Sequence, residues 1–235
     1  MLAHWREQIC KMNNKKSAGI SFVAAIIAAV LFLVWTALLL TVDLHPAGPC
    51  DSVVGLSGLN EYMLGIQKSV PDNIQNIFYN ASEMIGTLSL AVMAAFAFFG
   101  VVQLVKRKSL KKIDLNLYFL AALYALMLAL YVFFEIVVVN CRPILVEGVL
   151  EASYPSSHTV LTACVMFSAA FILCGYMKGR ALRVIINVSA LALSLVTFAG
   201  RFLSCVHWFS DIIGAILLSA ALVGLFFAAC FKYSK

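Results

Sequence analysis

Long, unbroken apolar stretches separated by short polar connections form the pattern of this chain. The stretches do not alternate apolar and polar residues as the strands of an outer-membrane barrel do. A helix needs about 20 apolar residues to cross the hydrocarbon core of a bilayer. Six stretches reach that length, so the pattern predicts an all-α, polytopic membrane protein with six transmembrane helices, at about 19–42, 82–105, 116–139, 158–177, 184–203 and 211–231.

One connection, residues 43–81, is much longer than the others. It begins with turn residues and continues into a mixed apolar and polar segment, Leu59 to Ile77. Such a segment favours an amphipathic helix lying along the membrane interface. We therefore expect a single membrane domain over residues 1–235, with a structured loop at 43–81.

The composition supports a membrane location. Of the 235 residues, 63% are apolar and 12% are charged, about half the roughly 25% of charged residues in a soluble domain. This is too little polar surface to cover a water-soluble globule of this size. A secreted or cytosolic enzyme is therefore excluded, and the composition gives no indication of oligomeric state.

The positive charges predict the orientation. Fourteen Lys and Arg residues lie in the two tails and in the connections 106–115 and 178–183, whereas the alternate connections hold only Lys68, Arg142 and Arg201. Because cytoplasmic loops carry the excess of positive residues, both termini are expected in the cytoplasm. This distribution also explains the formal net charge of +6 without a nucleic-acid partner.

Polar groups at the ends of membrane spans are costly, so their positions are informative. Three clusters of them fall on the side opposite the basic connections in the predicted topology. They are Arg142-Pro143 after the third span, Pro155-Ser156-Ser157-His158 at the start of the fourth, and Arg201 with His207 and Asp211 before the sixth. The shared side predicts that the three clusters form one site.

The residue types in these clusters suit phosphoryl transfer. A helix beginning after Pro155 would offer free backbone N–H groups to an anion, and arginine forks match phosphate oxygens. His207 and Asp211 are four residues apart, so they share one helix face if the helix begins before His207. The carboxylate would then orient the imidazole as a nucleophile or base. The chain has no P-loop and no carboxylate cluster for Mg²⁺. These features favour a phosphohistidine mechanism without metal or cofactor.

In the order and spacing of these residues, the chain resembles the type 2 phosphatidic acid phosphatase (PAP2) superfamily, in its membrane lipid phosphatase branch. The signature of that family is Lys-x6-Arg-Pro, Pro-Ser-Gly-His and Ser-Arg-x5-His-x3-Asp, and this chain matches it at Arg142-Pro143, Pro155-Ser156-Ser157-His158 and Arg201-x5-His207-x3-Asp211. The resemblance implies a PAP2-like bundle of six transmembrane helices.

The resemblance also implies a role for each matching residue. His207 would be the nucleophile, Asp211 its orienting partner, and His158 the acid toward the leaving oxygen and then the base toward water. The phosphate would be held by Arg142, Arg201 and Ser156 and by backbone N–H groups near Ser157.

Three positions depart from the family pattern. Gly200 replaces a serine and Ser157 replaces a glycine, both small changes, but Glu135 stands where the family has lysine, seven residues before Arg142. Three interpretations stay open for Glu135. It points away or pairs with Arg142 or Arg201; it meets a cationic or hydroxyl group of an altered substrate, or acts as a donor when protonated; or it marks weakened or lost activity.

Other residues of the same membrane face have simpler interpretations. Glu147 and Glu151 are expected at the rim of the site, with a metal-assisting role left open. Trp208 fits an anchor at the membrane interface at least as well as a substrate contact. The chain has seven cysteines, and spacing alone leaves open whether Cys50, Cys141 or Cys205 form a disulfide.

The resemblance implies a cell-membrane enzyme that releases phosphate from lipid phosphates or diphosphates on the outer side. Substrates of this class include undecaprenyl diphosphate, phosphatidic acid and phosphatidylglycerol phosphate, and the partners are then the lipid substrate and the bilayer. Two alternatives stay open: a lipid phosphotransferase using the same site, and a non-catalytic PAP2-like protein that binds or transports lipid.

Overall fold

The computed structural model describes residues 2–233, with side chains described for residues 14–233. Helices dominate it, which confirms the all-α prediction. The helices are α1 (Leu2–Thr41), α2 (Ser57–Lys68), α3 (Asp72–Arg107), α4 (Leu115–Ile136), α5 (Ser157–Tyr176), α6 (Arg180–Leu203) and α7 (Phe209–Tyr233). All of these except α2 are long and apolar enough to cross a membrane.

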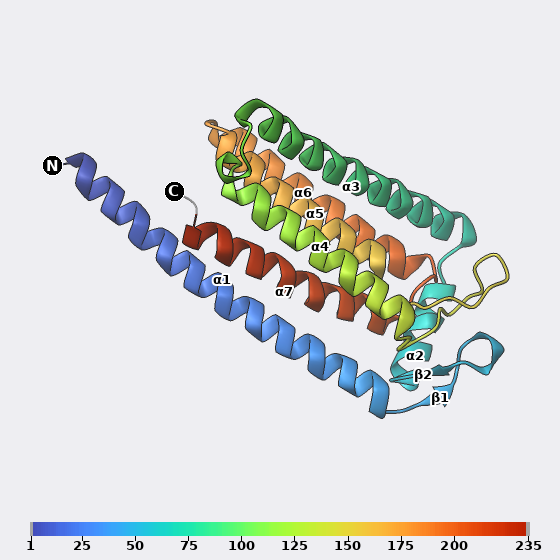
Figure 1. The fold of residues 1–235 in the computed structure, drawn as a ribbon. Helices are drawn as coiled ribbons and strands as arrows, with labels where there is room; N and C mark the ends of the chain where they lie inside the picture. Colours follow the sequence, from blue (N-terminus) through green and yellow to red (C-terminus); the bar gives the residue numbers. More distant parts are fainter. Residues whose placement is uncertain (1, 234–235) are drawn as a thin grey trace.

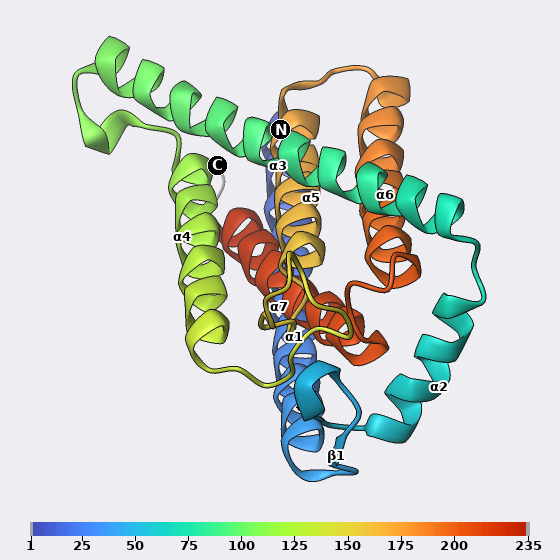
Figure 2. The same ribbon diagram turned by 90° about the vertical axis from the view of Figure 1, so that its right-hand side faces the viewer.

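The long helices run side by side around a central pair, α5 and α7 (Figures 1 and 2). Helix α1 packs along α7 on one side, while α4 contacts both α5 and α7 on another. Helix α3 crosses α5 and α6 obliquely. Both ends of the described chain lie at the same end of the bundle (Figure 1).

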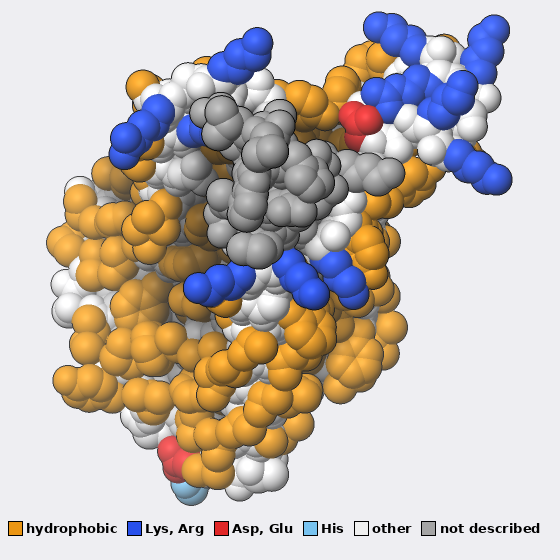
Figure 3. All heavy atoms as spheres, turned by 90° about the vertical axis from the view of Figure 1, so that its left-hand side faces the viewer, with side chains coloured by type: hydrophobic (Ala, Val, Ile, Leu, Met, Phe, Trp, Pro, Cys, Tyr) orange, Lys and Arg blue, Asp and Glu red, His pale blue; other side chains and the backbone are white. Residues whose placement is uncertain are grey.

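Lys and Arg side chains gather at that end, which we call the basic end (Figure 3). It includes the turn between α3 and α4, with the short 3₁₀ helix η2 (Leu110–Lys112). There Asp114 pairs with Arg107 at 2.7 Å and accepts a hydrogen bond from Gln103 at 2.7 Å. These contacts hold the pKa of Asp114 below its usual value, Arg107 having the largest effect.

The opposite end, which we call the site end, carries the irregular structure of the chain. Between α1 and α2 lie a short antiparallel pair, β1 (His45–Pro46) and β2 (Val53–Val54), and the 3₁₀ helix η1 (Pro49–Asp51). Residues 137–156 connect α4 to α5 and cover the same end (Figure 1).

The structure shifts several of the predicted boundaries. Helix α3 begins at Asp72, ten residues before the predicted 82, and α4 ends at Ile136 rather than 139. The helix expected over 59–77 is interrupted between α2 and α3 at Pro71. Proline has no N–H to donate and disfavours a helical conformation in the preceding residue, so the chain turns there and starts a new helix.

Small residues bring α1 and α7 together. A Cβ added at Gly224 of α7 would lie 2.9 Å from the Cβ of Ala25 in α1. Such close approach is typical of helix packing in membranes, where small side chains let helix backbones meet. Near the site end, Tyr154 stacks on Phe32 of α1, and its hydroxyl forms a 2.7 Å hydrogen bond with Thr36. These contacts tie the connection after α4 to the first helix.

Candidate functional site

The three clusters of polar residues meet at the site end. Arg142 lies in the connection after α4, Ser156 to His158 open α5, Arg201 lies in the last turn of α6, and His207 and Asp211 flank the start of α7. A cavity of about 920 Å³ reaches Arg142, Ser157, His158 and His207. The structure thus brings residues far apart in sequence to one place, as the topology predicted.

Asp211 organises the turn that carries His207. Helix α7 begins only at Phe209, so the two residues do not share a helix face, and that part of the prediction was wrong. Instead, Asp211 reaches back from the first turn: its Oδ2 accepts the backbone N–H of Trp208 at 3.0 Å and lies 3.5 Å from Nδ1 of His207. An acidic residue that caps the backbone in this way fixes the start of a helix. The carboxylate still faces the imidazole.

Several buried polar atoms of the site have no hydrogen-bond partner among the described residues. Among them are Oγ of Ser156, Nε and Nη1 of Arg201 and Nε2 of His207. Buried polar atoms are nearly always hydrogen-bonded. A set of hydroxyl, guanidinium and imidazole atoms left open together fits an oxyanion with several acceptor oxygens. The first N–H groups of α5, which have no partner within the helix, lie at the same place.

Burial lowers the pKa of His207 below its ordinary value of 6.5. Its side chain is 1% exposed, and removal from water disfavours the charged imidazolium. The hydrogen-bonding contact with Asp211 acts in the opposite direction, while the charges of Arg142 and Arg201 lower the pKa further. The imidazole is therefore neutral at pH 7, with Nε2 free to act as a nucleophile.

Each arginine of the site is paired with a carboxylate. Nε of Arg142 lies 3.0 Å from Oε2 of Glu151, and its Nη1 donates to the carbonyl of Val206 at 3.4 Å. Nη2 of Arg201 donates to Oε1 of Glu83 at 2.7 Å. Glu151 is 43% exposed, consistent with the rim position predicted for it, and its partner there is Arg142.

Glu83 is the residue that sequence reasoning missed. Its second oxygen, Oε2, lies 3.3 Å from Nε2 of His158, so one carboxylate of α3 joins the second and third motifs of the site through His158 and Arg201. No motif contains Glu83. The available signal was a lone carboxylate inside an apolar span, which is costly and marks a functional position by default.

Glu135 is exposed at the end of α4 and lines the cavity. The ion pairs recorded for Arg142 and Arg201 are with Glu151 and Glu83 instead. The pairing of Glu135 with either arginine, one of the interpretations above, is not found.

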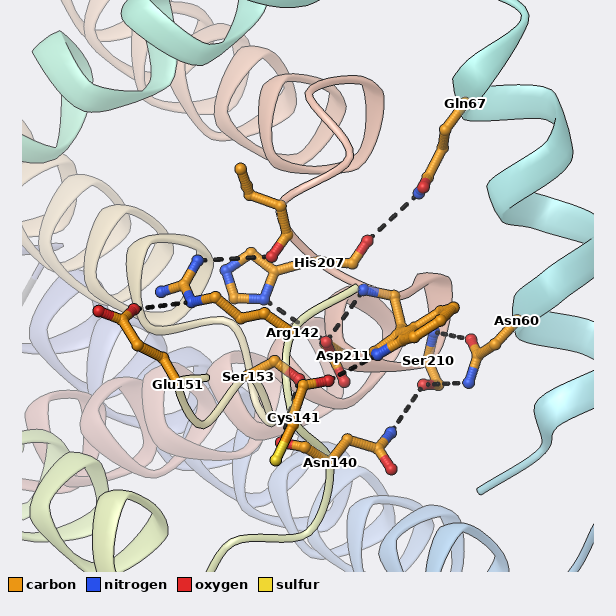
Figure 4. A network of polar contacts seen from close by, with 12 residues as sticks. Asn60, Gln67, Asn140, Cys141, Arg142, Glu151, Ser153, His207, Ser210 and Asp211 are labelled. Atoms are coloured by element: carbon orange, nitrogen blue, oxygen red, sulfur yellow. Dashed lines mark hydrogen bonds and ion pairs between the residues drawn. The ribbon is translucent and has the colours of Figure 1, made fainter. Parts of the chain in front are cut away.

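A polar network braces the turn between α6 and α7 (Figure 4). Asn60 of α2 donates to Oγ of Ser210 at 2.9 Å and accepts from the Ser210 N–H at 3.1 Å. Asn140 donates to the same hydroxyl at 3.5 Å and accepts from the N–H of Gly55. Gln67 donates to the carbonyl of His207 at 3.3 Å. The loop and α2 thereby hold the backbone at His207 in position.

Trp208 belongs to this network and not to the membrane interface. It is 1% exposed, and its indole N–H donates to the carbonyl of Cys141 at 2.7 Å. The prediction of an interfacial anchor was therefore wrong, because the motif turn buries the ring. Cys50, Cys141 and Cys205 are free thiols, and within residues 14–233 no group of three His, Cys, Asp or Glu side chains is arranged to hold a metal ion.

The cavity extends far beyond the polar cluster, between α3 and α4. Its walls run along α3 from Glu83 to Leu104 and along α4 from Leu117 to Glu135, and the start of α5 forms its floor. At 1.5 Å per helical residue, the lined part of α4 is about 27 Å long. The lining is mostly apolar except at the site end. A groove of this shape can hold a lipid chain with its headgroup at the polar end.

Comparison with known proteins agrees with this geometry. Residues 137–235 match the PAP2 superfamily, a region that includes Arg142 and every other motif residue of the site. The resemblance drawn from the motifs is therefore confirmed. No curated protein matches the chain significantly in sequence.

The fold is that of a transmembrane PAP2 protein. The chain is similar in structure to a transmembrane PAP2 type phosphatidylglycerolphosphate phosphatase from Bacillus subtilis, with a TM-score of 0.62. The likeness covers 89% of this chain and 96% of the other, at 14% sequence identity. It extends beyond the matched family region to the helices that form the groove.

Proposed function

We propose that this protein is an integral membrane phosphatase that releases phosphate from lipid phosphates or diphosphates through a phosphohistidine on His207. The observation that carries the proposal is the set of buried, unpartnered donor atoms beside neutral His207. They lie at the polar end of an apolar groove long enough for a lipid chain. The PAP2 fold and the family match support the same reaction class.

The proposed reaction has two steps. Nε2 of His207 attacks phosphorus in line, the P–O bond to the lipid breaks, and protonated His158 gives its proton to the leaving oxygen. Water then attacks the phosphohistidine, His158 takes its proton, and the P–N bond breaks to release inorganic phosphate. Arg142, Arg201, Ser156 and the N–H groups near Ser157 bind the phosphate oxygens, and Asp211 orients His207. No metal ion or cofactor takes part.

The groove supports an amphiphilic substrate that enters sideways from the bilayer. Undecaprenyl diphosphate, phosphatidic acid and phosphatidylglycerol phosphate belong to this class, and the last is what the Bacillus subtilis protein named above acts on. Glu135, exposed at the cavity wall, supports the interpretation in which it meets a cationic or hydroxyl group of the substrate.

We further propose that the site faces the outer side of the cell membrane. The concentration of Lys and Arg at the basic end supports this orientation (Figure 3), because positive residues are retained on the cytoplasmic side. Both termini are then cytoplasmic.

The test is phosphate release in detergent micelles from a panel of lipid phosphates and diphosphates. The panel is run with EDTA and with Mg²⁺ on the wild type, on His207→Ala and on His45→Ala, a matched change of an exposed histidine at the same end. We expect release that resists EDTA, persists in His45→Ala and disappears in His207→Ala. Release that survives His207→Ala contradicts the mechanism.

The same panel separates the two alternatives. Phosphoryl transfer to an added lipid or sugar acceptor, in place of release to water, would identify a phosphotransferase. Lipid binding without release or transfer would identify a non-catalytic protein.

A further inference from the structure

Glu83 lies among the residues that are proposed to bind the phosphate of a substrate. Its two carboxylate oxygens contact Nη2 of Arg201 at 2.7 Å and Nε2 of His158 at 3.3 Å. These are the cation and the proton donor that the proposed reaction assigns to the substrate. The Glu83 side chain is 39% exposed and lines the cavity, whereas that of Arg201 is 2% exposed. The carboxylate therefore stands between the groove and the buried arginine.

Two glycines fix the helix that carries Glu83. A Cβ at Gly86 would lie 2.7 Å from Cδ2 of His158, so a larger residue would force the imidazole or α3 to shift. A Cβ at Gly200, next to Arg201, would lie 2.7 Å from the carbonyl oxygen of Phe78 and 2.9 Å from Cβ of Ser82. Gly200 is one of the positions that depart from the family pattern. The position where glycine replaces the serine of the family pattern is therefore also the position where α3 comes close to α6, near Glu83.

The pairing leaves the site partly open to an anion. Only Nη2 of Arg201 is engaged, while its Nε and Nη1 are buried without a partner. An incoming phosphate can bind these atoms but must displace the carboxylate to gain the rest of the guanidinium and His158. A carboxylate carries one negative charge, and a phosphate monoester carries about 1.5 to 2 at pH 7. A phosphate diester carries only one.

We propose that Glu83 is a specificity residue, a resident carboxylate that only a doubly charged phosphate monoester or terminal diphosphate displaces. This inference rests on the proposed function. The groove opens toward the bilayer, where singly charged phosphodiester headgroups would reach the two arginines by the same route. Glu83 competes with them from within the chain, so the site does not fill with ordinary membrane lipid.

The first experiment measures binding without turnover. The midpoint of thermal unfolding is followed against inorganic phosphate concentration, since a ligand of the native state raises it. Glu83→Gln is compared with wild type and with Glu61→Gln, a matched change on the exposed face of α2. We expect Glu83→Gln to half-saturate at about tenfold lower phosphate, the order of one charged hydrogen bond, and Glu61→Gln to match wild type.

The second experiment measures how well the site excludes a phosphodiester lipid. Phosphatidic acid hydrolysis in nonionic micelles is followed with and without a tenfold excess of phosphatidylglycerol, a phosphodiester. We expect little inhibition of wild type, and in Glu83→Gln an apparent KM raised about tenfold by the phosphodiester with kcat unchanged. Strong inhibition of wild type overturns the proposal, and this arm does not depend on folding of the variant.

Two other results also overturn it. A Glu83→Gln enzyme with lower kcat and unchanged phosphate affinity would place Glu83 in the alignment of His158. Equal phosphate affinity in all three proteins would mean that the carboxylate does not compete. If none of the three proteins hydrolyses lipid phosphate but Glu83→Gln binds phosphate more tightly than the other two, the proposed function fails. The inference that Glu83 competes with phosphate then still stands.

Discussion

Helices α5 and α7 differ sharply from α3 in their surroundings. More than half of the apolar stretch of α5 and of α7 is buried within the protein, 61% and 56%, against 11% for α3. The buried pair carries His158 and Asp211, and His207 directly precedes α7. Helix α3 lies across α5 and α6 with most of its surface facing outward (Figure 2). It contributes a single charged contact to the site, Glu83.

This difference separates two tasks. Groups that must keep a fixed geometry lie on helices held from several sides, as preorganised catalysis requires. The carboxylate that has to leave when substrate arrives lies on a helix whose apolar stretch is mostly exposed, and its side chain can move while the helix keeps its place. Changes in the buried pair should therefore remove activity, and changes along α3 and α4 should alter which substrates are accepted.

The largest effect is expected for Asp211→Asn. The amide keeps the shape of the side chain but no longer favours a protonated Nδ1 on His207, so the imidazole loses its correct tautomer. By analogy with loss of the carboxylate in a catalytic triad, phosphate release should fall about 10²- to 10⁴-fold. Asp72→Asn, at the exposed start of α3, should match wild type in the same assay. Undiminished activity in Asp211→Asn would contradict its orienting role.

A smaller loss is expected for Gly200→Ser, although it restores the serine of the family pattern. The added Cβ would meet the backbone of Phe78 and the side chain of Ser82, so α3 must shift away from α6. Overpacking of this kind costs about 1–3 kcal/mol of stability, and a displacement of about 1 Å can reduce activity about 100-fold.

Thermal unfolding and steady-state kinetics measure both effects of Gly200→Ser. The control is Gly175→Ala, where a Cβ would meet nothing within 4 Å. A stable and fully active Gly200→Ser variant would show that α3 tolerates the shift without consequence.

The groove can be tested with two adjacent alanines of α4. Ala121 lines the cavity and Ala122 does not, although both are exposed. In Ala121→Trp the indole should displace one or two methylenes of a bound chain, each worth about 0.8 kcal/mol, so KM for long-chain substrates should rise about four- to fifteen-fold. Ala122→Trp should behave as wild type. Equal KM values in the two variants would exclude this groove as the chain-binding surface.

The smallest effect concerns pH. Burial lowers the pKa of His207 in the native state. Below about pH 6.5 the unfolded chain therefore binds a proton that the native chain does not, so the stability decreases as the pH is lowered. Between pH 7.5 and about pH 5, the thermal unfolding midpoint of wild type should therefore decrease more than that of His207→Gln. Each 1 kcal/mol of stability lost lowers the midpoint by about 2–4 °C. His45→Gln should follow wild type, and parallel curves for His207→Gln and wild type would contradict the shift.

Hydropathy was sufficient to find the spans but not their ends. The start of α3, from Asp72 onward, mixes polar and apolar residues, so an apolar threshold misses it even though the helix is continuous. Pro71 marks the true boundary. The turn at His207 was missed for a similar reason: spacing of four residues suggests a helix face, but the Asp211 carboxylate instead caps the helix at Trp208.

The motifs predicted which residues meet, because each motif sits at the end of a span and the spans fix the side. They could not predict the carboxylate partners. Glu83 and Glu151 reach the arginines through the tilt of α3 and the path of the 137–156 connection. Both are tertiary features without a local sequence pattern. The role of Gly86 and Gly200 in the close packing of α3 can be recognised only when the atoms that a Cβ would meet are known.

The contact between the first and the last helix has a consequence for biogenesis. Trp35 of α1 donates a hydrogen bond to the carbonyl of Ser210, and Thr36 forms one with Tyr154. The turn that carries His207 is therefore stabilised by a helix that is synthesised long before it, since Trp35 and Ser210 are 175 residues apart. During synthesis α1 is in the bilayer without its main packing partner until α7 has been inserted. A nascent chain stopped before the last span has no assembled site, and the chain gains its reactive geometry only when it is complete.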